Sequence, residues 1–582
     1  MRVKSLIDGG KTAVKKAVER FPLVIILSAA AALITIYMAE KSMYGWEQGL
    51  SRFIIVLCLG IPLYLCVYVL LERINKENHK EKYFYHGAGA LLLVLYWRFV
   101  YTGVSMVIVT RHIGLILILI LCFLVIPYIK QEENFELYII KILSRLFITA
   151  IYAFVLQIGI SAILATLNYL LEINIKFELY YYTWLLIMGV FAPCYFLGGI
   201  PRKGEVLTVE EYPKGLKVLM LYIIMPLISI YTVILYLYFG KIIITSQWPE
   251  GLVSHLVLWY GVISAGTLFL ISKLKAGNKW AEVYTKVFPM AILPLMVMMF
   301  TSIGIRIGEY GVTENRYFVV ALGLWVFGIM IYLALATKKK FIILPISLAV
   351  IMLISVCGPL SSYSVSVRSQ NKRFSNILKK NEMLSEGSIV KSSKELSKAD
   401  KQDISSILHY FDRNHSLSQV KYLPKNFNYK DMKSLMGFED VEGYGYNYSA
   451  NKYFYFGTEG NFTKIDLKGY DYMIQGTSYS GGGNRFGDGI NGDYRQKERK
   501  FVLNKDGKEI YFKVMDEYAE KLIEEYGWDN SGKNILTDMI FEDENDQVKV
   551  KFIFKSMSGE TSGETNEIKN VDCEFIVLVK MK

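Results

Sequence analysis

Residues 317 to 336, "YFVVALGLWVFGIMIYLALA", form an uninterrupted apolar run between "RIGEYGVTENR" (306–316) and "TKKKF" (337–341). A helix of about 20 apolar residues is long enough to cross the hydrocarbon core of a bilayer. Charged residues stand at both ends of the run, where a spanning helix leaves the lipid. This stretch therefore predicts a transmembrane helix, and it sets the class of the whole chain.

The composition agrees with that class. The chain has 582 residues, of which 53% are hydrophobic and 14% aromatic, and this is too apolar for a soluble protein with an ordinary surface. The sequence predicts eleven spanning helices, over residues 21–39, 53–71, 83–101, 113–129, 146–171, 179–200, 218–239, 252–271, 287–303, 317–336 and 341–358. The first run is long and lacks a small-residue cleavage site, so we interpret it as a retained span rather than a signal peptide.

The distribution of Lys and Arg predicts the orientation. With the amino terminus in the cytoplasm, the inner segments carry 24 Lys and Arg residues and the outer loops carry 7, as the positive-inside rule expects. An odd number of spans then places everything after Gly358 outside the cytoplasm. Residues 359–582 hold 33 basic and 34 acidic residues, so the +12 net charge belongs to the membrane half. Topology thus explains the basic balance, and we expect no nucleic-acid partner.

We therefore expect an α-helical polytopic membrane bundle (1–358), a helical membrane-proximal segment (359–422) and a β-rich extracytoplasmic α+β domain (423–582). In the segment, "SVSVRSQNKRFSNILKKNEML" (364–384) has helical spacing of apolar residues, and Ser397 is a plausible N-cap of the next helix. After residue 423, short alternating runs separated by Gly-rich turns predict strands, with one helix at "MDEYAEKLIEEYG" (515–527).

The exported part offers little chemistry. Cys573 is its one cysteine, so it has no internal disulfide, which fits a bacterial envelope. No His or Cys pair has metal-ligand spacing, and we expect neither a metal nor a cofactor. The Gly-rich loop 476–496 lacks both P-loop and EF-hand spacing and is interpreted as a hairpin connection. The tyrosines of "EGYGYNYSANKYFYFG" (442–457) either pack in the sheet or stack on sugars of the cell wall.

Ionisable residues at the predicted outer ends of the spans are the candidate binding residues, because charge at membrane depth usually has a partner or a water-lined site. They form a predicted outer polar cluster of Arg98, His255, Arg306, Glu309, Glu314 and Arg316. We expect Arg98 to pair with Glu314 or with Glu309. The alternative is structural: a tight turn at Gly308 and Gly311, a Thr313 N-cap, and snorkelling by Arg98.

Three stretches carry a resemblance to a known family. "EYGVTENRY" (309–317), "SQNKRFSNILKKNEML" (369–384) and "LSKADKQDISSILHYF" (396–411) resemble the bacterial membrane-protein family called domain of unknown function 4153. The likeness is most specific at Tyr310, Gly311, Thr313, Glu314 and Arg316. It implies a multi-pass membrane protein and carries no activity with it.

Two classes of function fit best. The first is a scaffold or sensor in the cell membrane, whose exported domain binds an envelope component or a protein partner. The second is a permease with the outer polar cluster as its vestibule, for which Pro289 and Pro294 in the ninth span suggest a broken helix. A lipid- or sugar-modifying enzyme comes third, since Glu309 and Glu314 are the only candidate carboxylate pair.

Overall fold

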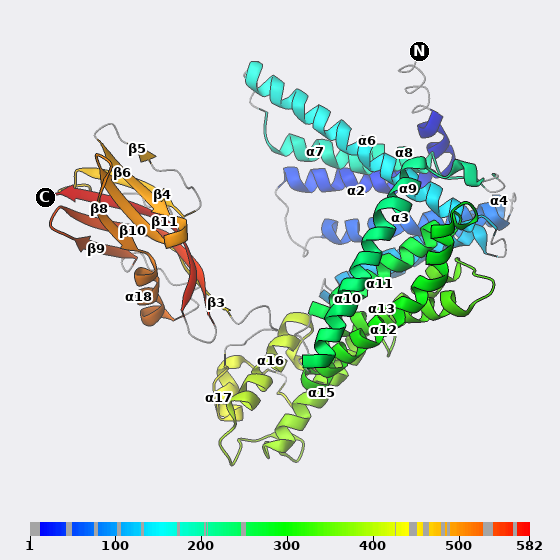
Figure 1. The fold of residues 1–582 in the computed structure, drawn as a ribbon. Coiled ribbons are helices and arrows are strands. Elements are labelled where there is room, and N and C mark those ends of the chain that lie inside the picture. The colour runs from blue at the N-terminus through cyan, green and yellow to red at the C-terminus, as the bar shows by residue number, and fades with distance from the viewer. Residues whose placement is uncertain are drawn as a thin grey trace. The chain divides into compact units, whose positions relative to one another are not determined.

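The structure is a computed structural model. It describes residues 12–41, 49–74, 79–101, 106–129, 133–171, 175–202, 205, 208–245, 252–424, 426–441, 451–457, 465–478, 484–485, 489–527, 539–562 and 567–582. The chain divides into two compact units, Met1–Gly443 and Tyr444–Lys582, and each is described by itself. The first unit is helical and the second is rich in strands (Figure 1).

Long apolar helices make up most of the first unit. They are α2 (Pro22–Glu40), α3 (Gly49–Ile74), α4 (His79–Tyr101), α5 (Met106–Val125), α6 (Phe135–Leu170), α7 (Glu178–Leu186), α8 (Ala192–Leu197), α9 (Lys214–Val218), α10 (Met225–Thr245), α11 (Leu252–Ile271), α12 (Lys279–Tyr310), α13 (Glu314–Leu335) and α14 (Ile343–Val356). π-helical turns at Ile187–Phe191 and Leu219–Ile224 join α7 to α8 and α9 to α10, so each pair forms one continuous helix.

Nine helices in the described residues are long and apolar enough to cross a membrane. All eleven predicted runs are helical, but two fall short of those criteria. In α4, His86, Arg98 and several aromatic residues dilute the apolar run, and α14 has only 14 residues. The expected count of eleven spans is therefore corrected to nine clear candidates and two weaker helices.

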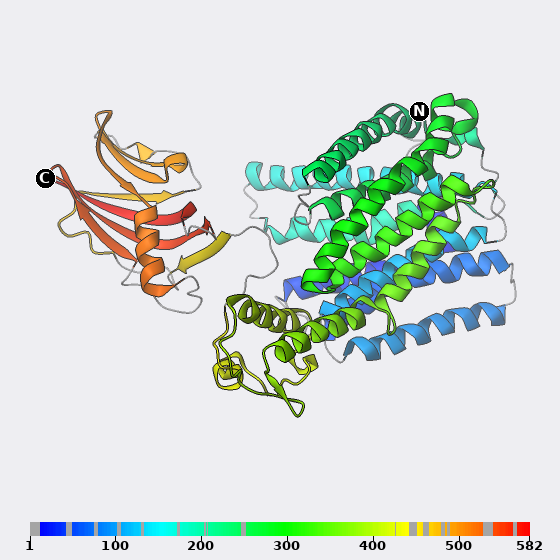
Figure 2. The ribbon, with the colours of Figure 1, turned by 60° about the horizontal axis from the view of Figure 1, so that its bottom comes forward.

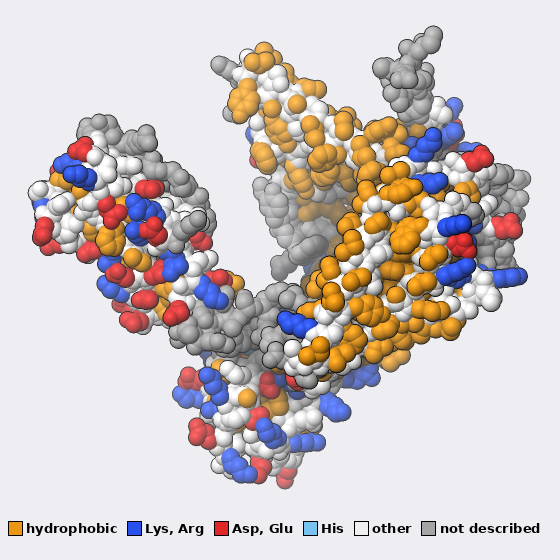
Figure 3. Space-filling model, viewed as in Figure 1, with side chains coloured by type: hydrophobic (Ala, Val, Ile, Leu, Met, Phe, Trp, Pro, Cys, Tyr) orange, Lys and Arg blue, Asp and Glu red, His pale blue; other side chains and the backbone are white. Residues whose placement is uncertain are grey.

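The helices lie side by side, with hydrophobic side chains over their outer surfaces and Lys and Arg gathered toward the end that carries the amino terminus (Figures 2 and 3). Large apolar side chains are left exposed along α6 and α10, among them Phe147 (67%) and Leu237 (71%). An apolar outer surface is what lipid contact requires, because lipid tails solvate such side chains as well as a protein core does. The membrane assignment thus rests on length, composition and exposure together.

Small residues allow two close helix contacts inside the bundle. A Cβ on Gly189 would meet the Cβ of Ala32 at 2.4 Å and the carbonyl oxygen of Ser28 at 3.2 Å. A Cβ on Gly323 would meet Cε of Met299 at 2.5 Å. Close approach of backbones at small residues is the usual way that helices pack in membranes.

A helical layer of α15 (Ser362–Lys380), α16 (Lys398–Asn414) and α17 (Met432–Met436) follows α14. One core holds this layer together, with Phe374, Ile404, Leu408, Phe411 and Met432 fully buried. The Ser397 side chain caps α16 by accepting from the backbone N–H of Asp400, as predicted. The helical segment thus continues past residue 422 as far as α17, and the compact unit that contains it includes the membrane helices.

Two antiparallel sheets form the second unit. The first has the order β3 (Asn451–Gly457), β10 (Val548–Ser562), β11 (Ile568–Met581) and β4 (Tyr472–Thr477), with β9 (Ile540–Glu544) also on β10. The second has the order β5 (Asn484–Arg485), β6 (Ile490–Arg495), β7 (Lys500–Lys505) and β8 (Lys508–Val514). The predicted strands and the helix α18 (Asp516–Tyr526), with Gly527 as its C-cap, are confirmed.

A shared aromatic core packs the two sheets face to face. The ring of Phe501 on β7 lies 5.6 Å from Phe552 on β10 and 5.7 Å from Phe575 on β11. Helix α18 adds Tyr518 and Leu522 to the same core. This unit therefore has a hydrophobic core of its own.

Candidate functional site at the α12 to α13 turn

The turn between α12 and α13 contains the residues that carried the family resemblance. Helix α12 ends at Tyr310, and Gly311 follows with φ +71° and ψ −179°, a conformation that is open almost only to glycine. A Cβ at Gly311 would also lie 3.0 Å from Nε2 of Gln370 on α15. Glycine is therefore required here both by the backbone angle and by the close approach of α15.

Arg316 closes the turn from the start of α13. Its guanidinium donates to the carbonyl oxygens of Gly311 at 2.7 Å and Tyr310 at 3.3 Å, and it lies over the Tyr310 ring at 5.4 Å. A cation is favourable there because carbonyls at the carboxyl end of a helix lack intrahelical partners and carry partial negative charge. Arg316 is buried, and its contacts describe a structural role for this motif residue.

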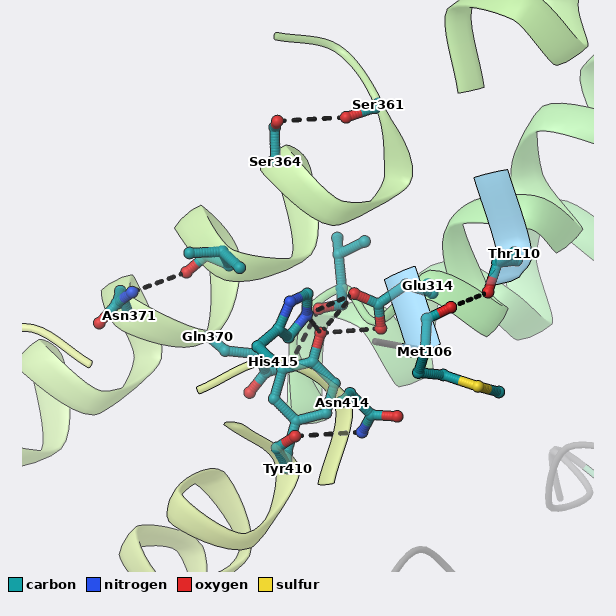
Figure 4. Close-up of polar contacts among 12 residues, drawn as sticks. Met106, Thr110, Glu314, Ser361, Ser364, Gln370, Asn371, Tyr410, Asn414 and His415 are labelled. Carbon is teal, nitrogen blue, oxygen red and sulfur yellow. Dashed lines mark hydrogen bonds and ion pairs between the residues drawn. The ribbon is translucent and has the colours of Figure 1, made fainter. Parts of the chain in front are cut away.

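Thr313 and Glu314 occupy the N-cap and first-turn positions of α13, as expected. The Thr313 side chain makes no capping hydrogen bond, so that part of the prediction is wrong. The Glu314 carboxylate instead faces away from its own helix toward the layer that follows α14 (Figure 4).

Glu314 is bound by two residues of the α16 region. The Tyr410 hydroxyl donates to both carboxylate oxygens at 2.8 Å. Nε2 of His415 lies 2.7 Å from Oε1 of Glu314 and 3.0 Å from the Tyr410 hydroxyl. Because a carboxylate accepts hydrogen bonds, this distance implies that Nε2 carries the proton and donates it. Glu314, Tyr410 and His415 together are called the α16 contact below.

The α16 contact is shielded from solvent. The side chain of His415 is 3% exposed and that of Glu314 is 21% exposed, and Tyr410 is buried. A charge-assisted hydrogen bond is stronger in such surroundings than at an open surface, because water competes less. The contact therefore joins the start of a membrane helix to a helix more than 80 residues further along the chain.

Helix α15 also contacts this turn. The Gln370 amide donates to the carbonyl oxygens of Tyr310 and Val312, each at 3.0 Å, and the Ser369 hydroxyl accepts from the Val312 N–H at 2.8 Å. Ser362, Ser366 and Gln370, spaced four residues apart on α15, are buried polar side chains. The contact between α15 and the bundle is thus largely polar.

The structure does not gather the predicted outer polar cluster into one site. Arg98 is exposed on α4, Glu309 is exposed at the end of α12, and His255 and Arg306 are half-buried on α11 and α12. In the part of the chain that the structure describes, no ion pair or hydrogen bond joins any of these four residues to Glu314. The expected pairing of Arg98 with Glu314 is wrong, because Tyr410 and His415 occupy that carboxylate.

Sequence reasoning missed Tyr410 and His415 as partners of the turn. Tyr410 lies in a stretch that we interpreted as an amphipathic helix, and His415 lies one residue beyond α16. The adjacency of these residues to the α12 to α13 turn was the missing information. A polar Tyr and His at the end of an otherwise apolar helix face were the only signal in the sequence.

A second polar group, also missed, lies at the other ends of the helices. Arg20, next to the start of α2, pairs with Glu72 at 2.6 Å and donates to the carbonyl oxygen of Ile200 at 2.7 Å. Lys273 after α11 lies 3.2 Å from Glu136 on α6. Arg20, Glu72, Glu136 and Lys273 are called the Arg20 cluster below.

The two stretches with the most unusual composition lie largely outside the described residues. Gly481 to Gly483 and Asp488 of the Gly-rich loop, and Tyr444, Tyr446 and Tyr448, lie outside the described residues. Asp493 is on β6 and half-buried. Among the residues that the structure describes, no group of three or more His, Cys, Asp or Glu side chains is arranged to hold a metal ion.

Comparison with known proteins identifies the family. Residues 23–385 match the family "Domain of unknown function (DUF4153)", which covers the membrane helices, the α12 to α13 turn and α15 but stops before Tyr410. "Uncharacterized protein PM1469" of Pasteurella multocida (strain Pm70) is 25% identical over 344 residues, or 58% of this chain and 57% of that protein. No solved structure matches. The chain belongs to the DUF4153 family of proteins with a domain of unknown function.

Proposed function

We propose that the protein is a scaffold or sensor of the bacterial cell membrane. In this proposal the α15 to α17 layer and the β-rich domain lie outside the cytoplasm, and the β-rich domain binds a component of the cell envelope. The membrane helices anchor the chain and receive the binding event through the helical layer.

The α16 contact is the observation that carries the proposal. A sensor needs a defined connection between its membrane helices and the layer that follows them, and Glu314 is held by Tyr410 and His415 from beyond the last membrane helix. The polar character of the α15 interface is typical of surfaces between parts that move relative to one another. Through these contacts, a displacement of α16 would be transmitted to the membrane helices at one specific point, the start of α13.

Two features make a permease a weaker alternative. Helix α12 runs without interruption from Lys279 to Tyr310 in spite of Pro289 and Pro294, so it lacks the break that substrate-binding helices of many transporters show. The carboxylate that was the best candidate for a vestibule is occupied by Tyr410 and His415. A catalytic pair is weakened in the same way, because Glu309 is exposed and Glu314 is bound.

Reporter fusions test the location. A reporter that works only outside the cytoplasm should be active when fused after Gly358 and inactive when fused after Lys340. Activity after Lys340 would reverse the orientation and remove the basis for an envelope ligand.

Complementation tests the function. In a strain that lacks the gene, expression of the full chain should correct the resulting defect. Residues 1–443 should not correct it, although they reach the membrane at equal levels. A scaffold or sensor requires both parts. If residues 1–443 correct the defect completely, the first unit works without the β-rich domain and a permease becomes the better description.

A further inference from the structure

The outer face of the five-stranded sheet carries two exposed aromatic side chains. On β3, Phe454 and Phe456 point into the core and are 2% and 0% exposed. Tyr453 and Tyr455 alternate with them and are 66% and 60% exposed. Side chains two residues apart on a strand share a face and are about 6.6 Å apart along it. Two large rings thus stand side by side in solvent and form one aromatic surface.

Tyr455 lies flat on the strand. A Cβ added at Gly457 would lie 2.6 Å from the Tyr455 hydroxyl and 3.0 Å from both Cε1 and Cζ of its ring. The ring therefore extends along β3 over Gly457, and the missing side chain is what makes room for it. The outer end of the ring thus lies against Gly457, while Tyr455 as a whole remains 60% exposed.

Polar side chains flank the rings on the neighbouring strands. Tyr455 is opposite Ser558 on β10, which is opposite Asp572 on β11. Tyr453 is opposite Glu560, which is opposite Asn570. Directly opposed residues of antiparallel strands point to the same face. The open face therefore combines aromatic rings with Ser558 and Glu560 on the next strand and, one strand further, with the Asp572 carboxylate, which accepts from Ser478, and the Asn570 amide, whose oxygen accepts from the Glu560 N–H.

We infer that this face, defined by Tyr453, Tyr455, Ser558, Glu560, Asn570 and Asp572, binds a carbohydrate polymer. The inference rests on the proposed function, because it names the chemical class of the envelope component. An aromatic ring has a negative face, which attracts the C–H groups on the flat side of a sugar ring. Carboxylates and amides accept and donate the hydrogen bonds that sugar hydroxyls and acetamido groups make.

The surroundings favour a neutral or amino sugar over other ligands. Glu560 and Asp572 give the face negative charge, which opposes polyanions such as nucleic acids and phosphate-rich polymers. Among the described residues, those across from the tyrosines are polar, whereas protein partners use apolar anchor pockets. Among macromolecules of the envelope, an uncharged or N-acetylated glycan fits this composition best.

Binding of the purified full chain in detergent to insoluble glycans tests the inference. The probes are chitin as a neutral N-acetylated polymer, purified cell-wall sacculi, and immobilised dextran sulfate as a polyanion. The wild type should be retained by chitin or sacculi at physiological salt. Tyr455→Ala should weaken that retention at least about tenfold, as expected for an aromatic contact residue.

Three further variants separate stacking from folding. Tyr455→Phe keeps the ring and should bind within about threefold of the wild type, since the stacking surface is unchanged. Phe512→Ala removes a matched aromatic residue, 55% exposed on β8 in the other sheet, and should bind like the wild type. Gly457→Ala lifts the Tyr455 ring and should give an intermediate loss with unchanged circular dichroism.

Failure of the inference is distinguishable from failure of the proposed function. No retention on chitin or sacculi, equal loss in Phe512→Ala, or retention on dextran sulfate alone would each overturn glycan binding. If the reporter after Gly358 is active and residues 1–443 still fail to complement, the scaffold or sensor survives with a different ligand. An inactive reporter after Gly358 would reject the proposed function whatever the glycan result.

Discussion

The Arg20 cluster and the α16 contact occupy opposite ends of the membrane helices and use charge differently. Arg20 is held by the Glu72 carboxylate and by two backbone carbonyls, and every partner lies at the end of a neighbouring membrane helix. Glu314 is held by a Tyr and a His that lie beyond the last membrane helix. The first group ties helices to one another, whereas the second ties the bundle to the layer that follows it.

The two groups therefore differ in what they can do. An ion pair whose partners all belong to the bundle stabilises the bundle but cannot couple it to another layer. A pair that bridges two layers can also report a shift of one layer to the other, because breaking it has a local consequence. We therefore expect substitutions in the Arg20 cluster to unfold the membrane half, and substitutions in the α16 contact to release α16 while the bundle remains intact.

The largest effect should follow removal of Arg20. The Arg20 side chain is 9% exposed and that of Glu72 is 32% exposed, and loss of one partner of a buried ion pair costs about 3–5 kcal/mol. Arg20→Ala should thus lower the thermal midpoint of the full chain in detergent more than any other variant here. Glu19→Gln is the matched control, because the Lys15–Glu19 pair is exposed and worth little. A wild-type midpoint for Arg20→Ala would show that the cluster is dispensable.

Glu314→Ala should have a smaller and more local effect. It leaves the Tyr410 hydroxyl and the His415 imidazole without their carboxylate, at a cost of about 1.5–3 kcal/mol. Amide hydrogen exchange should accelerate in α16 and remain unchanged in α11. Glu309→Ala removes an exposed carboxylate at the end of α12, and its hydrogen exchange should match that of the wild type. Faster exchange throughout the membrane helices would contradict the distinction between the two clusters.

A double substitution measures the coupling directly. If Glu314 and His415 act as one contact, Glu314→Ala with His415→Ala should cost clearly less than the two single losses combined. The same cycle with Arg98→Ala should be additive, because Arg98 is exposed on α4. Additive losses for Glu314 and His415 would remove the α16 contact as a connection between the layers.

Gly311→Ala should come next, at about 1–2 kcal/mol, because an alanine resists the backbone angles of Gly311 and crowds Gln370. Gly308→Ala is the control, because Gly308 lies within α12 and not in the turn where the sequence predicts it. Gly308 is helical and a Cβ there meets nothing within 4 Å, so alanine should be neutral or stabilise by up to about 1 kcal/mol. The thermal midpoint of Gly311→Ala should therefore fall, whereas that of Gly308→Ala should stay unchanged or rise, and an equal fall in both would show that the loss at Gly311 is not specific to its backbone angles.

The smallest expected effect is the pH dependence of stability that Asp400 contributes. Burial tends to raise the pKa of the Asp400 carboxyl, but hydrogen bonds from Lys380, Ser397 and Asn381 outweigh it and hold that pKa below its ordinary value. A carboxyl whose pKa is lower in the folded state than in the unfolded state stabilises the fold at any pH above its unfolded-state pKa. That stabilisation is lost as the pH falls through the folded-state pKa. Asp400→Asn should therefore loosen α16 by about 0.5–1 kcal/mol at pH 7 and make no difference in strong acid. If Asp400→Asn is still less stable than the wild type in strong acid, the effect comes from packing and not from the charge of Asp400.

Apolar run length and strand alternation, which are local properties, were enough to predict the helices, most strands and the change from one class of structure to the other. The run at 317–336 became α13, and the alternating Phe and Tyr residues of "KYFYFG" became β3 with two rings inside and two outside. Burial of apolar surface dictates such patterns, and it can be read from one segment at a time.

The polar contacts were decided only by tertiary structure. Glu314 could be placed at the first turn of α13 from its neighbours, yet the partner of its carboxylate depended on which helix end packs beside that turn. The same holds for Arg20 with Glu72, and for the flat position of Tyr455, which needs Gly457 beneath it. A hydrogen bond acts over about 3 Å, so its partners follow from the packing of distant segments, which spacing along the chain does not encode.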